Sequence, residues 1–207
     1  MRAYTPLRRK GVTCKIIVYY PRDMITGIIL AGGESTRAGQ NKLLLEVNGK
    51  PLLLHTIESV RPFVDKIVVV TGKYHNEMAP LLKDVEVIHN QNYKDGMFSS
   101  VKAGVMQAEG NFFIIPGDCP CVSKDVFKAL LKCDDFSIRV PVYDGHTGHP
   151  MYVNRTHRRQ MLHEPLESNL RIFRDEVGYE TVEVKDKNIL NDIDTIEDYE
   201  KLLKERK

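Results

Sequence analysis

The stretch GIILAGGESTRAGQNKLLLEVNGKPLL, residues 27–53, decides how the rest of the chain is interpreted. It begins as an apolar run typical of a buried strand and breaks at the glycine pair Gly32 and Gly33. The loop that follows carries a serine, an arginine and a lysine before an amphipathic pattern starts at Pro51. Such a loop is either an ordinary connection between a strand and a helix or a binding site for an anion.

Short apolar runs alternate with helical patterns from Met24 onward, which is typical of βαβ units. Strands are predicted at residues 25–31, 66–72, 85–90, 111–116 and 179–184, and helices at 51–63, 74–84, 96–108, 123–133 and 195–207. Two antiparallel strands, 136–145 and 148–154, are expected around the turn DGHTG. The predicted fold is α/β: a three-layer, open, mostly parallel, Rossmann-like sheet with a C-terminal antiparallel hairpin.

The composition is that of a globular protein with one core. The 207 residues are 42% hydrophobic and 28% charged, which argues against disorder and against membrane spanning as overall descriptions. A formal charge of +2 does not favour nucleic acid as the main ligand. No apolar signal-peptide core precedes Met24 and the four cysteines form no repeated CxxC pair, so a cytoplasmic location is expected.

Residues 1–23 do not follow the alternation of the rest of the chain. They contain a basic run, residues 8–10, and a short apolar run, residues 16–20, that would suit an edge strand. We expect an N-terminal extension that is mobile or loosely docked, followed by a single domain formed by residues 24–207.

The glycine loop lies where an open α/β sheet binds its ligands, outside the carboxyl end of a strand. Paired glycines let backbone amides approach phosphate oxygens, Ser35 adds a hydroxyl donor, and Arg37 and Lys42 add two positive charges. A Walker loop would require GK followed by Ser or Thr, and a dinucleotide fingerprint would require GxGxxG opening a helix; neither is present. From these residues alone, phosphate binding and a plain connection both stay open.

The segment LAGGESTRAGQNK resembles the LAGGxSxRxGxxK signature of the MobA-like nucleotidyltransferases, a family that includes the molybdenum cofactor guanylyl- and cytidylyltransferases. The resemblance runs from about Thr26 to the C-terminus, and it departs at Ala38, where the family usually has methionine. Further on, GMFSSVKAG resembles the family's GMxxSLxxG segment beside the nucleotide, and IIPGDCPCV resembles the GDMPxV strand end that carries a metal-binding aspartate.

Two other segments bear on the base that is transferred. GHPMYV and NDIDTIEDYEKL resemble the GHPxLF and DIDTPEDL segments typical of the cytidylyltransferase-like branch. The glycine pair, by contrast, gives the LAGG that is more typical of guanylyltransferases, since the cytidylyl branch more often has LAAG. The choice between CTP and GTP therefore stays open.

The resemblance implies a nucleotide-diphospho-sugar transferase-like fold and a Mg²⁺-dependent reaction. In that reaction CMP passes from CTP to the phosphate of molybdopterin, or of the molybdenum cofactor, with release of pyrophosphate. Guanylyl transfer, nucleotidyl transfer to another phosphorylated acceptor and, in a different class, a non-catalytic cofactor carrier are the alternatives. The implied partners are the NTP, the acceptor and a molybdenum hydroxylase or its chaperone, without nucleic acid or membrane.

The site residues follow from the chemistry and from the matching motifs. The second pKa of a phosphate monoester is about 6, so the nucleophile is already ionised at neutral pH and no general base is required. The enzyme's task is alignment and charge neutralisation, for which Arg37, Lys42 and Asp118 are the catalytic candidates. Mg²⁺ prefers oxygen ligands, which Asp118 and Asp194 would supply, with Asp192 as the close alternative to Asp194.

The predicted nucleotide-binding set is Leu30, Ala31, Gly32, Gly33, Ser35, Arg37, Lys42, Thr71, Ser99, Ser100 and Asp118. His149 is the candidate donor to the acceptor's pterin or phosphate, and Arg139 and His146 are weaker candidates for the same role. Each has a structural alternative: a strand-end aspartate for Asp118, a helix cap for Asp194, first-turn residues for the two serines and a turn histidine for His149. Cys119 and Cys121 are interpreted as small buried side chains.

Overall fold

The computed structural model describes residues 24–33, 41–132, 137–193 and 198–200. The strands are β1 (Ile25–Ala31), β2 (Glu46–Val47), β3 (Lys50–Pro51), β4 (Lys66–Thr71), β5 (Glu86–His89), β6 (Asn111–Pro116), β7 (Ile138–Tyr143), β8 (His146–Thr147), β9 (Met151–Val153) and β10 (Glu180–Glu183). The α-helices are α1 (Leu52–Val60), α2 (His75–Met78), α3 (Met97–Gln107), α4 (Lys124–Leu130), α5 (Arg158–His163) and α6 (Leu170–Val177). Short 3₁₀ turns are η1 (Lys42–Leu44), η2 (Arg61–Phe63), η3 (Ala79–Leu81), η4 (Tyr93–Asp95), η5 (Arg155–His157) and η6 (Lys187–Leu190).

The sheet is open and mostly parallel, as the sequence predicts. Its strand order is β10-β7-β9-β6-β1-β4-β5, with β8 paired to β7 outside this path. β1 pairs in parallel with β4 on one side and with β6 on the other, and β4 pairs in parallel with β5. β2 and β3 form a separate two-stranded ribbon between the glycine loop and α1.

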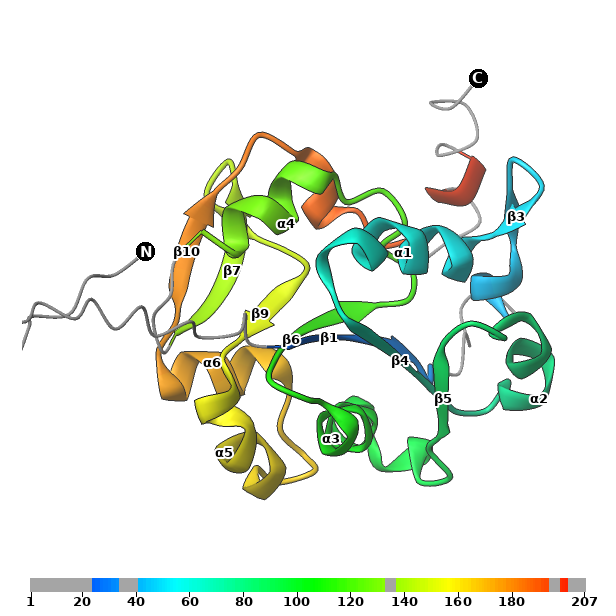
Figure 1. Cartoon of the computed structure of the whole chain (residues 1–207), viewed down its shortest axis with the longest axis horizontal. Helices are drawn as coiled ribbons and strands as arrows, with labels where there is room; N and C mark the ends of the chain where they lie inside the picture. Colours follow the sequence, from blue (N-terminus) through cyan, green and yellow to red (C-terminus); the bar gives the residue numbers. More distant parts are fainter. Residues whose placement is uncertain (1–23, 34–40, 133–136, 194–197, 201–207) are drawn as a thin grey trace, which may run out of the picture.

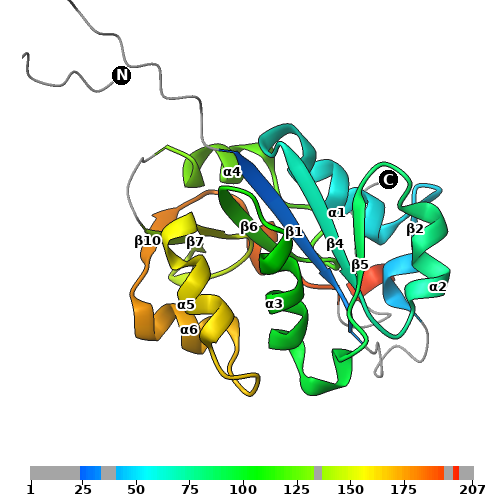
Figure 2. The same ribbon diagram turned by 60° about the horizontal axis from the view of Figure 1, so that its bottom comes forward.

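Helices cover both faces of this sheet (Figure 1). α1 and α4 lie on one face, and α3, α5 and α6 lie on the other, an arrangement that the turned view also shows (Figure 2). The strands have apolar side chains on both faces, because parallel strands covered by helices are buried on both sides. In β1, for example, Ile29 packs into the core under α1 and Ile28 packs into the core under α3.

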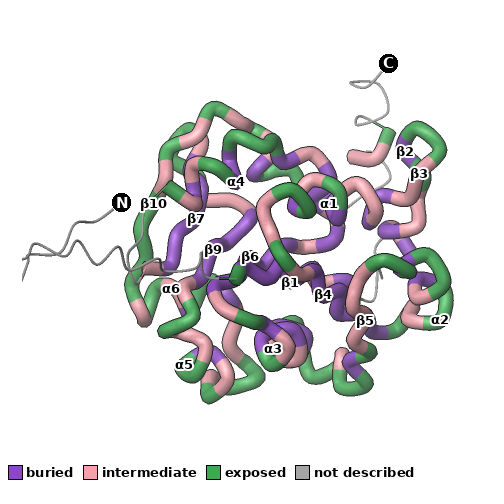
Figure 3. Tube along the Cα trace, in the orientation of Figure 1, coloured by how far each residue is buried: buried purple, intermediate pink, exposed green. Residues whose placement is uncertain are grey.

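Burial decreases from the middle of the sheet toward its edges. The central strands β1, β4 and β6 are almost entirely buried, whereas the edge strands β5 and β10 are partly or largely exposed (Figure 3). Each fully buried aliphatic or aromatic side chain contributes about 1.5–3 kcal/mol to folding. The central strands therefore form a rigid base for the loops at their ends.

The C-terminal part departs in detail from the predicted hairpin. β7 turns at Asp144 and Gly145, which both have positive φ, and it pairs first with the two-residue strand β8. The second predicted strand, β9, pairs antiparallel with β7 and also with β6, so it lies inside the main sheet. The predicted helix over residues 74–84 is interrupted at Pro80, where α2 gives way to η3. Of the predicted closing helix, residues 198–200 are described and they are helical.

None of the described helices is long and apolar enough to cross a membrane.

Candidate active site

The carboxyl ends of the parallel strands come together at one edge of the sheet. Ala31 at the end of β1 is level with Thr71 of β4, which is level with His89 of β5, and Leu30 is level with Pro116 of β6. The antiparallel strand β9 begins at this edge with Met151, two residues after His149. The start of the glycine loop, the turn after β6 and the start of β9 are thus neighbours. Open α/β sheets bind their ligands at this edge, outside the carboxyl ends of the strands.

Lys42 and Asp118 form an ion pair at this edge. Asp118 follows β6, and the backbone N–H of Gly117 donates to the carbonyl of Leu30 at 2.9 Å, which holds the turn against β1. Lys42 begins η1, and its Nζ atom lies 2.5 Å from Oδ2 of Asp118. The two side chains are 17% and 15% exposed. An ion pair screened to this degree from water is stronger than a surface pair and holds both groups in place.

Two hydrogen bonds join residues 192–193 to residues 118–119. The backbone N–H of Ile193 donates to the carbonyl of Asp118 at 3.1 Å, so the segment after η6 runs alongside the turn after β6. The thiol of Cys119 donates to Oδ1 of Asp192 at 2.9 Å. Ligand atoms of Asp118, Cys119 and Asp192 all lie within 4.8 Å of one another.

These three side chains have the chemistry of a site for a hard divalent cation. Burial raises the pKa of Cys119 well above its ordinary value, and the neighbouring carboxylates of Asp192 and Asp118 raise it further. The cysteine therefore stays a neutral thiol and donates a hydrogen bond, while the two carboxylates offer the oxygen ligands that Mg²⁺ prefers. The residues present fit Mg²⁺ better than a thiophilic metal.

The backbone at the end of β1 is packed tightly against α3. A Cβ atom at Gly32 would lie 2.7 Å from the hydroxyl of Ser100. Asn90, which follows β5, donates through Nδ2 to the hydroxyls of Ser99 at 2.8 Å and Ser100 at 3.0 Å. Ser99 also lies within hydrogen-bonding distance of the Gly96 carbonyl, at 2.7 Å. Ser99 is thus used by the helix start, whereas the hydroxyl hydrogen of Ser100 has no acceptor within the described part of the chain and lies beside Gly32.

Three further members of the predicted nucleotide set, Leu30, Ala31 and Thr71, belong to strands. The fully buried hydroxyl of Thr71 donates to the Ile88 carbonyl at 3.1 Å and is 2.8 Å from Nδ1 of His75. Leu30 and Ala31 are part of β1, with Ala31 buried. Because Thr71 and Ala31 are buried, a nucleotide contact from either of them would have to use the backbone.

His149 is held at the start of β9 by its backbone. Its N–H donates to the Ile189 carbonyl at 2.8 Å, and a side chain at Gly148 would clash with the same carbonyl. Nδ1 of His149 is buried and has no hydrogen-bond partner among the described residues. Burial lowers the pKa of this imidazole; the charges of Asp192 and Asp118 act in the opposite direction, and that of Arg174 lowers it further. His149 is therefore within electrostatic reach of the carboxylate pair.

The weaker acceptor candidates have other roles. Arg139 is 1% exposed, donates through Nη1 to the Leu130 carbonyl at 2.6 Å, lies over the ring of Tyr152 and pairs with Glu180. It holds the interior of the sheet together and does not reach the Asp118 edge. His146 is exposed, with Nδ1 2.7 Å from the Asp144 carbonyl in the β7–β8 turn.

Three predicted site residues, Ser35, Arg37 and Asp194, lie outside the described residues. Other residues of the site escaped prediction. Asn41 accepts a hydrogen bond from the Leu43 N–H at 3.2 Å, and its buried Nδ2 has no partner within residues 24–33, 41–132, 137–193 and 198–200. Asn90 contacts Ser100, which is 10 residues away, and Cys119 contacts Asp192, which is 73 residues away. In the sequence, the position of Asn41 directly before Lys42 was a local signal that it could belong to the site.

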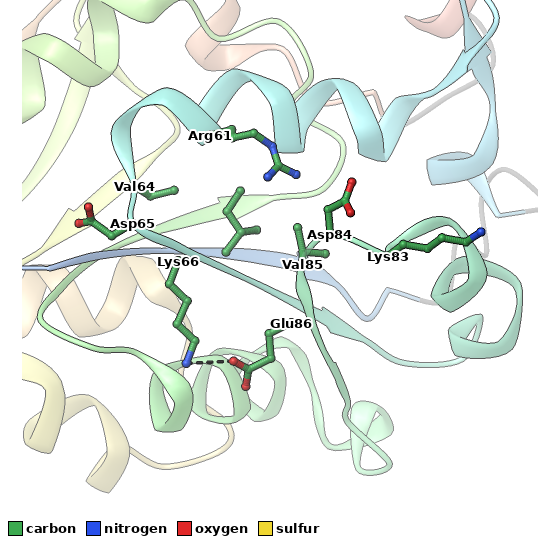
Figure 4. A pocket seen from close by; sticks show the side chains of 9 residues that line it. Arg61, Val64, Asp65, Lys66, Lys83, Asp84, Val85 and Glu86 are labelled. Atoms are coloured by element: carbon green, nitrogen blue, oxygen red, sulfur yellow. Dashed lines mark ion pairs between the residues drawn. The ribbon is translucent and has the colours of Figure 1, made fainter.

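A separate cavity of about 450 Å³ lies at the opposite edge of the sheet, where β4 and β5 begin (Figure 4). Its lining residues are Arg61, Val64, Asp65, Lys66, Ile67, Lys83, Asp84, Val85 and Glu86. Lys66 in its wall pairs with Glu86 at 2.9 Å and Glu109 at 3.1 Å. This cavity is far from the carboxyl ends of the strands and contains none of the predicted site residues.

Solved structures share this fold. A nucleotidyl transferase from Methanothermobacter thermautotroptrophicus superposes with a TM-score of 0.77 at 24% identity, covering 88% of this chain and 97% of that one. At this identity the likeness shows a shared fold, and in this chain the carboxylate pair and Lys42 lie at the edge of the sheet where the glycine loop leaves β1.

The chain belongs to the family of the MobA-like NTP transferase domain, whose family model matches residues 27–180. A molybdenum cofactor cytidylyltransferase from Escherichia coli (strain K12) is 31% identical over 177 residues, which are 83% of this chain and 92% of that protein. A probable molybdenum cofactor guanylyltransferase from Natranaerobius thermophilus is 29% identical over 157 residues, 69% of this chain and 74% of its own length. The resemblance found in the motifs is thereby confirmed.

Proposed function

We propose that this nucleotidyltransferase transfers CMP from CTP to the phosphate of molybdopterin, or of the molybdenum cofactor, and releases pyrophosphate. The observation that carries the proposal is the Lys42–Asp118 ion pair beside Asp192, at the edge where the glycine loop leaves β1. A cation and two carboxylates at the mouth of a phosphate-binding loop suit a reaction between two phosphate groups.

The chemical problem is repulsion between anions. Two unit charges about 4 Å apart near a protein surface interact by about 4 kcal/mol, so a triphosphate and an approaching phosphate repel each other strongly. Lys42 has three N–H donors, so it can keep one on Asp118 and direct the others at phosphate oxygens. Arg37, from the glycine loop, is proposed to add a second cation. The acceptor phosphate is ionised at neutral pH and attacks without a general base.

Asp118 and Asp192 are proposed to hold a magnesium ion, with Asp194 as the alternative to Asp192. Mg²⁺ bound there would neutralise charge on the phosphates and fix their oxygens in line. Cys119 would keep Asp192 turned toward Asp118, because its thiol donates to the Oδ1 atom of that carboxylate. The amides of Gly32 and Gly33 and the hydroxyl of Ser100 would receive the nucleotide from the other side.

The relatives favour CTP over GTP. The cytidylyltransferase from Escherichia coli matches a larger share of this chain, 83%, than the guanylyltransferase does, 69%. The GHP segment at residues 148–150 points the same way. The LAGG loop is the specific observation in favour of the second candidate, guanylyl transfer to the same acceptor. A carrier without catalytic activity would have no need for a lysine paired to a metal-binding aspartate.

We also propose the domain, the cellular compartment and the recipient of the product. Residues 24–207 act as one catalytic domain in the cytoplasm, apart from nucleic acid and membranes, and the product passes to a molybdenum hydroxylase or its chaperone.

A panel of four NTPs, each with and without molybdopterin, tests the proposed function. Pyrophosphate release and the mass of the product are measured with Mg²⁺ present. We expect release only with CTP and acceptor together, and a product heavier than the acceptor by one cytidylyl group. A guanylyl product would establish the second candidate instead, and tight cofactor binding without any pyrophosphate release would show that the protein is a carrier.

A further inference from the structure

Arg174 is a fixed and largely buried cation that the reaction described above does not use. It lies on α6, on the face of the sheet that α3 and α5 also cover (Figure 2). Its side chain is 11% exposed. Nη2 donates to the hydroxyl of Thr147 at 3.1 Å, Nε donates to Oδ1 of Asp175 at 3.2 Å, and the guanidinium lies 4.6 Å from the centre of the Tyr179 ring.

These contacts fix the orientation of the guanidinium before any ligand arrives. An exposed arginine loses rotamer entropy when it binds a ligand, whereas an anchored one has already lost it. Arg171, one turn earlier on the same helix, shows the difference. It pairs with the same Asp175, at 3.9 Å, but its side chain is 82% exposed. The helix thus presents one preorganised arginine and one solvated arginine.

The anchored arginine lies on the acceptor side of the site. Thr147, which receives the hydrogen bond from Arg174, is followed directly by Gly148 and His149. His149 is in turn held by Ile189, three residues before Asp192. The charges of Asp118, Asp192 and Arg174 all act on the His149 imidazole. His149 therefore connects the carboxylate pair, where the reacting phosphate must lie, with Arg174.

A second observation points to a ligand at this place. Nδ1 of His149 is buried without a hydrogen-bond partner among the described residues. A buried polar atom without a partner is costly, and native structures rarely keep one without a reason. A ligand that lies between His149 and Arg174 would provide the missing partner for the imidazole and a counter-charge for the guanidinium.

We propose that Arg174 and His149 form a subsite for the acceptor, and that Arg174 binds a negatively charged oxygen or sulfur group of the acceptor remote from its reacting phosphate. The proposal rests on the proposed function, because it names the part of the acceptor that this side of the site binds. The triphosphate is an unsuitable occupant, since Arg37 and Lys42 are the cations proposed to bind it. The planar fork of an arginine suits an anionic pair of atoms better than a lysine would.

Kinetics of Arg174 variants test this subsite. Arg174→Met removes the charge and keeps much of the volume, Arg174→Lys keeps the charge without the fork, and Arg171→Met is the matched control on the same helix. We expect Arg174→Met to raise the KM for molybdopterin about 10-fold to 100-fold, as loss of a charge-assisted hydrogen bond does, with the KM for CTP changed by less than about twofold. Arg174→Lys should recover part of the loss, and Arg171→Met should behave as the wild type.

Equilibrium binding of molybdopterin without NTP separates the two proposals. If the wild type binds molybdopterin but never releases pyrophosphate, the proposed transfer fails, and the Kd of Arg174→Met against that of the wild type still decides the subsite. An unchanged Kd and KM for molybdopterin in Arg174→Met would overturn the subsite. An equal rise in the KM for CTP and the KM for molybdopterin, together with a lowered Tm, would overturn it too. Such a result would show that Arg174 only holds Thr147 and Tyr179 in place. A wild type that binds no molybdopterin would refute both proposals.

Discussion

The Nζ atom of Lys42 lies 2.5 Å from Oδ2 of Asp118, although Lys42 stands at the start of η1 and Asp118 follows β6, far along the chain. The lysine follows the glycine loop and the aspartate follows β6, so the pair links the segment that receives the nucleotide to the segment proposed to hold a metal ion. The ion pair fixes the positions of the ammonium group and the carboxylate before substrate binds. This link gives the first prediction.

Lys42→Met and Asp118→Asn should each lower kcat/KM for CTP by about 100-fold or more, because each removes a charge aimed at the reacting phosphates. Steady-state pyrophosphate release measures the effect. Lys128→Met is the control, since Lys128 pairs with Asp125 at 3.1 Å on the exposed surface of α4. A Lys42→Met enzyme with wild-type kcat/KM would show that the ion pair is structural.

Replacing Cys119 should weaken metal binding through Asp192. Cys119→Ala leaves Oδ1 of Asp192 without its donor, and loss of such a supporting contact lowers metal affinity about 10-fold or more. Cys119→Ser keeps a donor and should stay close to the wild type. Affinity for Mn²⁺, measured by electron paramagnetic resonance of the free ion, reports the change without relying on turnover. Equal Mn²⁺ affinity in Cys119→Ala and the wild type would mean that the thiol only fills space.

Gly32→Ala should lower the free energy of unfolding by about 1 kcal/mol, because the new Cβ would lie 2.7 Å from the hydroxyl of Ser100 and push it from Asn90. In the double variant with Ser100→Ala the two costs should be less than additive, since the clash disappears with the hydroxyl. Urea denaturation measures all of these values. Gly33→Ala, at a position where a Cβ meets no atom within 4 Å, should be neutral. Strict additivity of the two substitutions would contradict the proposed contact.

Acidification should destabilise the protein through His149. Burial lowers the pKa of this imidazole below its ordinary value of 6.5, so below that pH the unfolded chain binds more protons than the folded one. Stability therefore falls as the pH drops from 6.5 toward the lowered pKa, by at most about 1.4 kcal/mol per pH unit for one group.

Chemical denaturation between about pH 8 and about pH 5 checks this expectation. His149→Gln should lose less stability over that range than the wild type, because glutamine takes up no proton. His146→Gln, in the exposed turn before it, should follow the wild-type curve. If the free energy of unfolding falls with pH by the same amount in His149→Gln and in the wild type, the imidazole is not the group that causes the loss of stability.

The sequence allowed the order and nature of most elements to be predicted, for a simple physical reason. Strands such as β1 and β4 are buried on both faces, so they appear as unbroken apolar runs, and β1 has the predicted bounds 25–31. The helix predicted over residues 74–84 is interrupted at Pro80, because proline removes an N–H from the helical hydrogen-bond pattern. Lys42 and Asp118 were found because each stands in a recognisable motif at a strand end.

Contacts between distant segments escaped prediction. Cys119 and Asp192 are 73 residues apart, and Arg174 and Thr147 are 27 apart. No local pattern marks such pairs, since only the folded sheet brings them together. For Arg139 the sequence suggested a site residue, whereas the structure has a core residue. A charged residue inside the apolar strand IRVPVY suggests a site, but the structure uses it for the Leu130 carbonyl and the Tyr152 ring inside the core.

β9 has a consequence for any attempt to build chimeric enzymes. Because it is bonded to β6 on one side and to β7 on the other, with Tyr152 level with both Phe113 and Arg139, the nucleotide half and the acceptor half share a strand. A graft that imports a foreign acceptor half from the β7–β8 turn onward would give β9 two unfamiliar neighbours. New acceptor preferences would therefore be easier to obtain by recombining the loops at the Asp118 edge than by shuffling the halves.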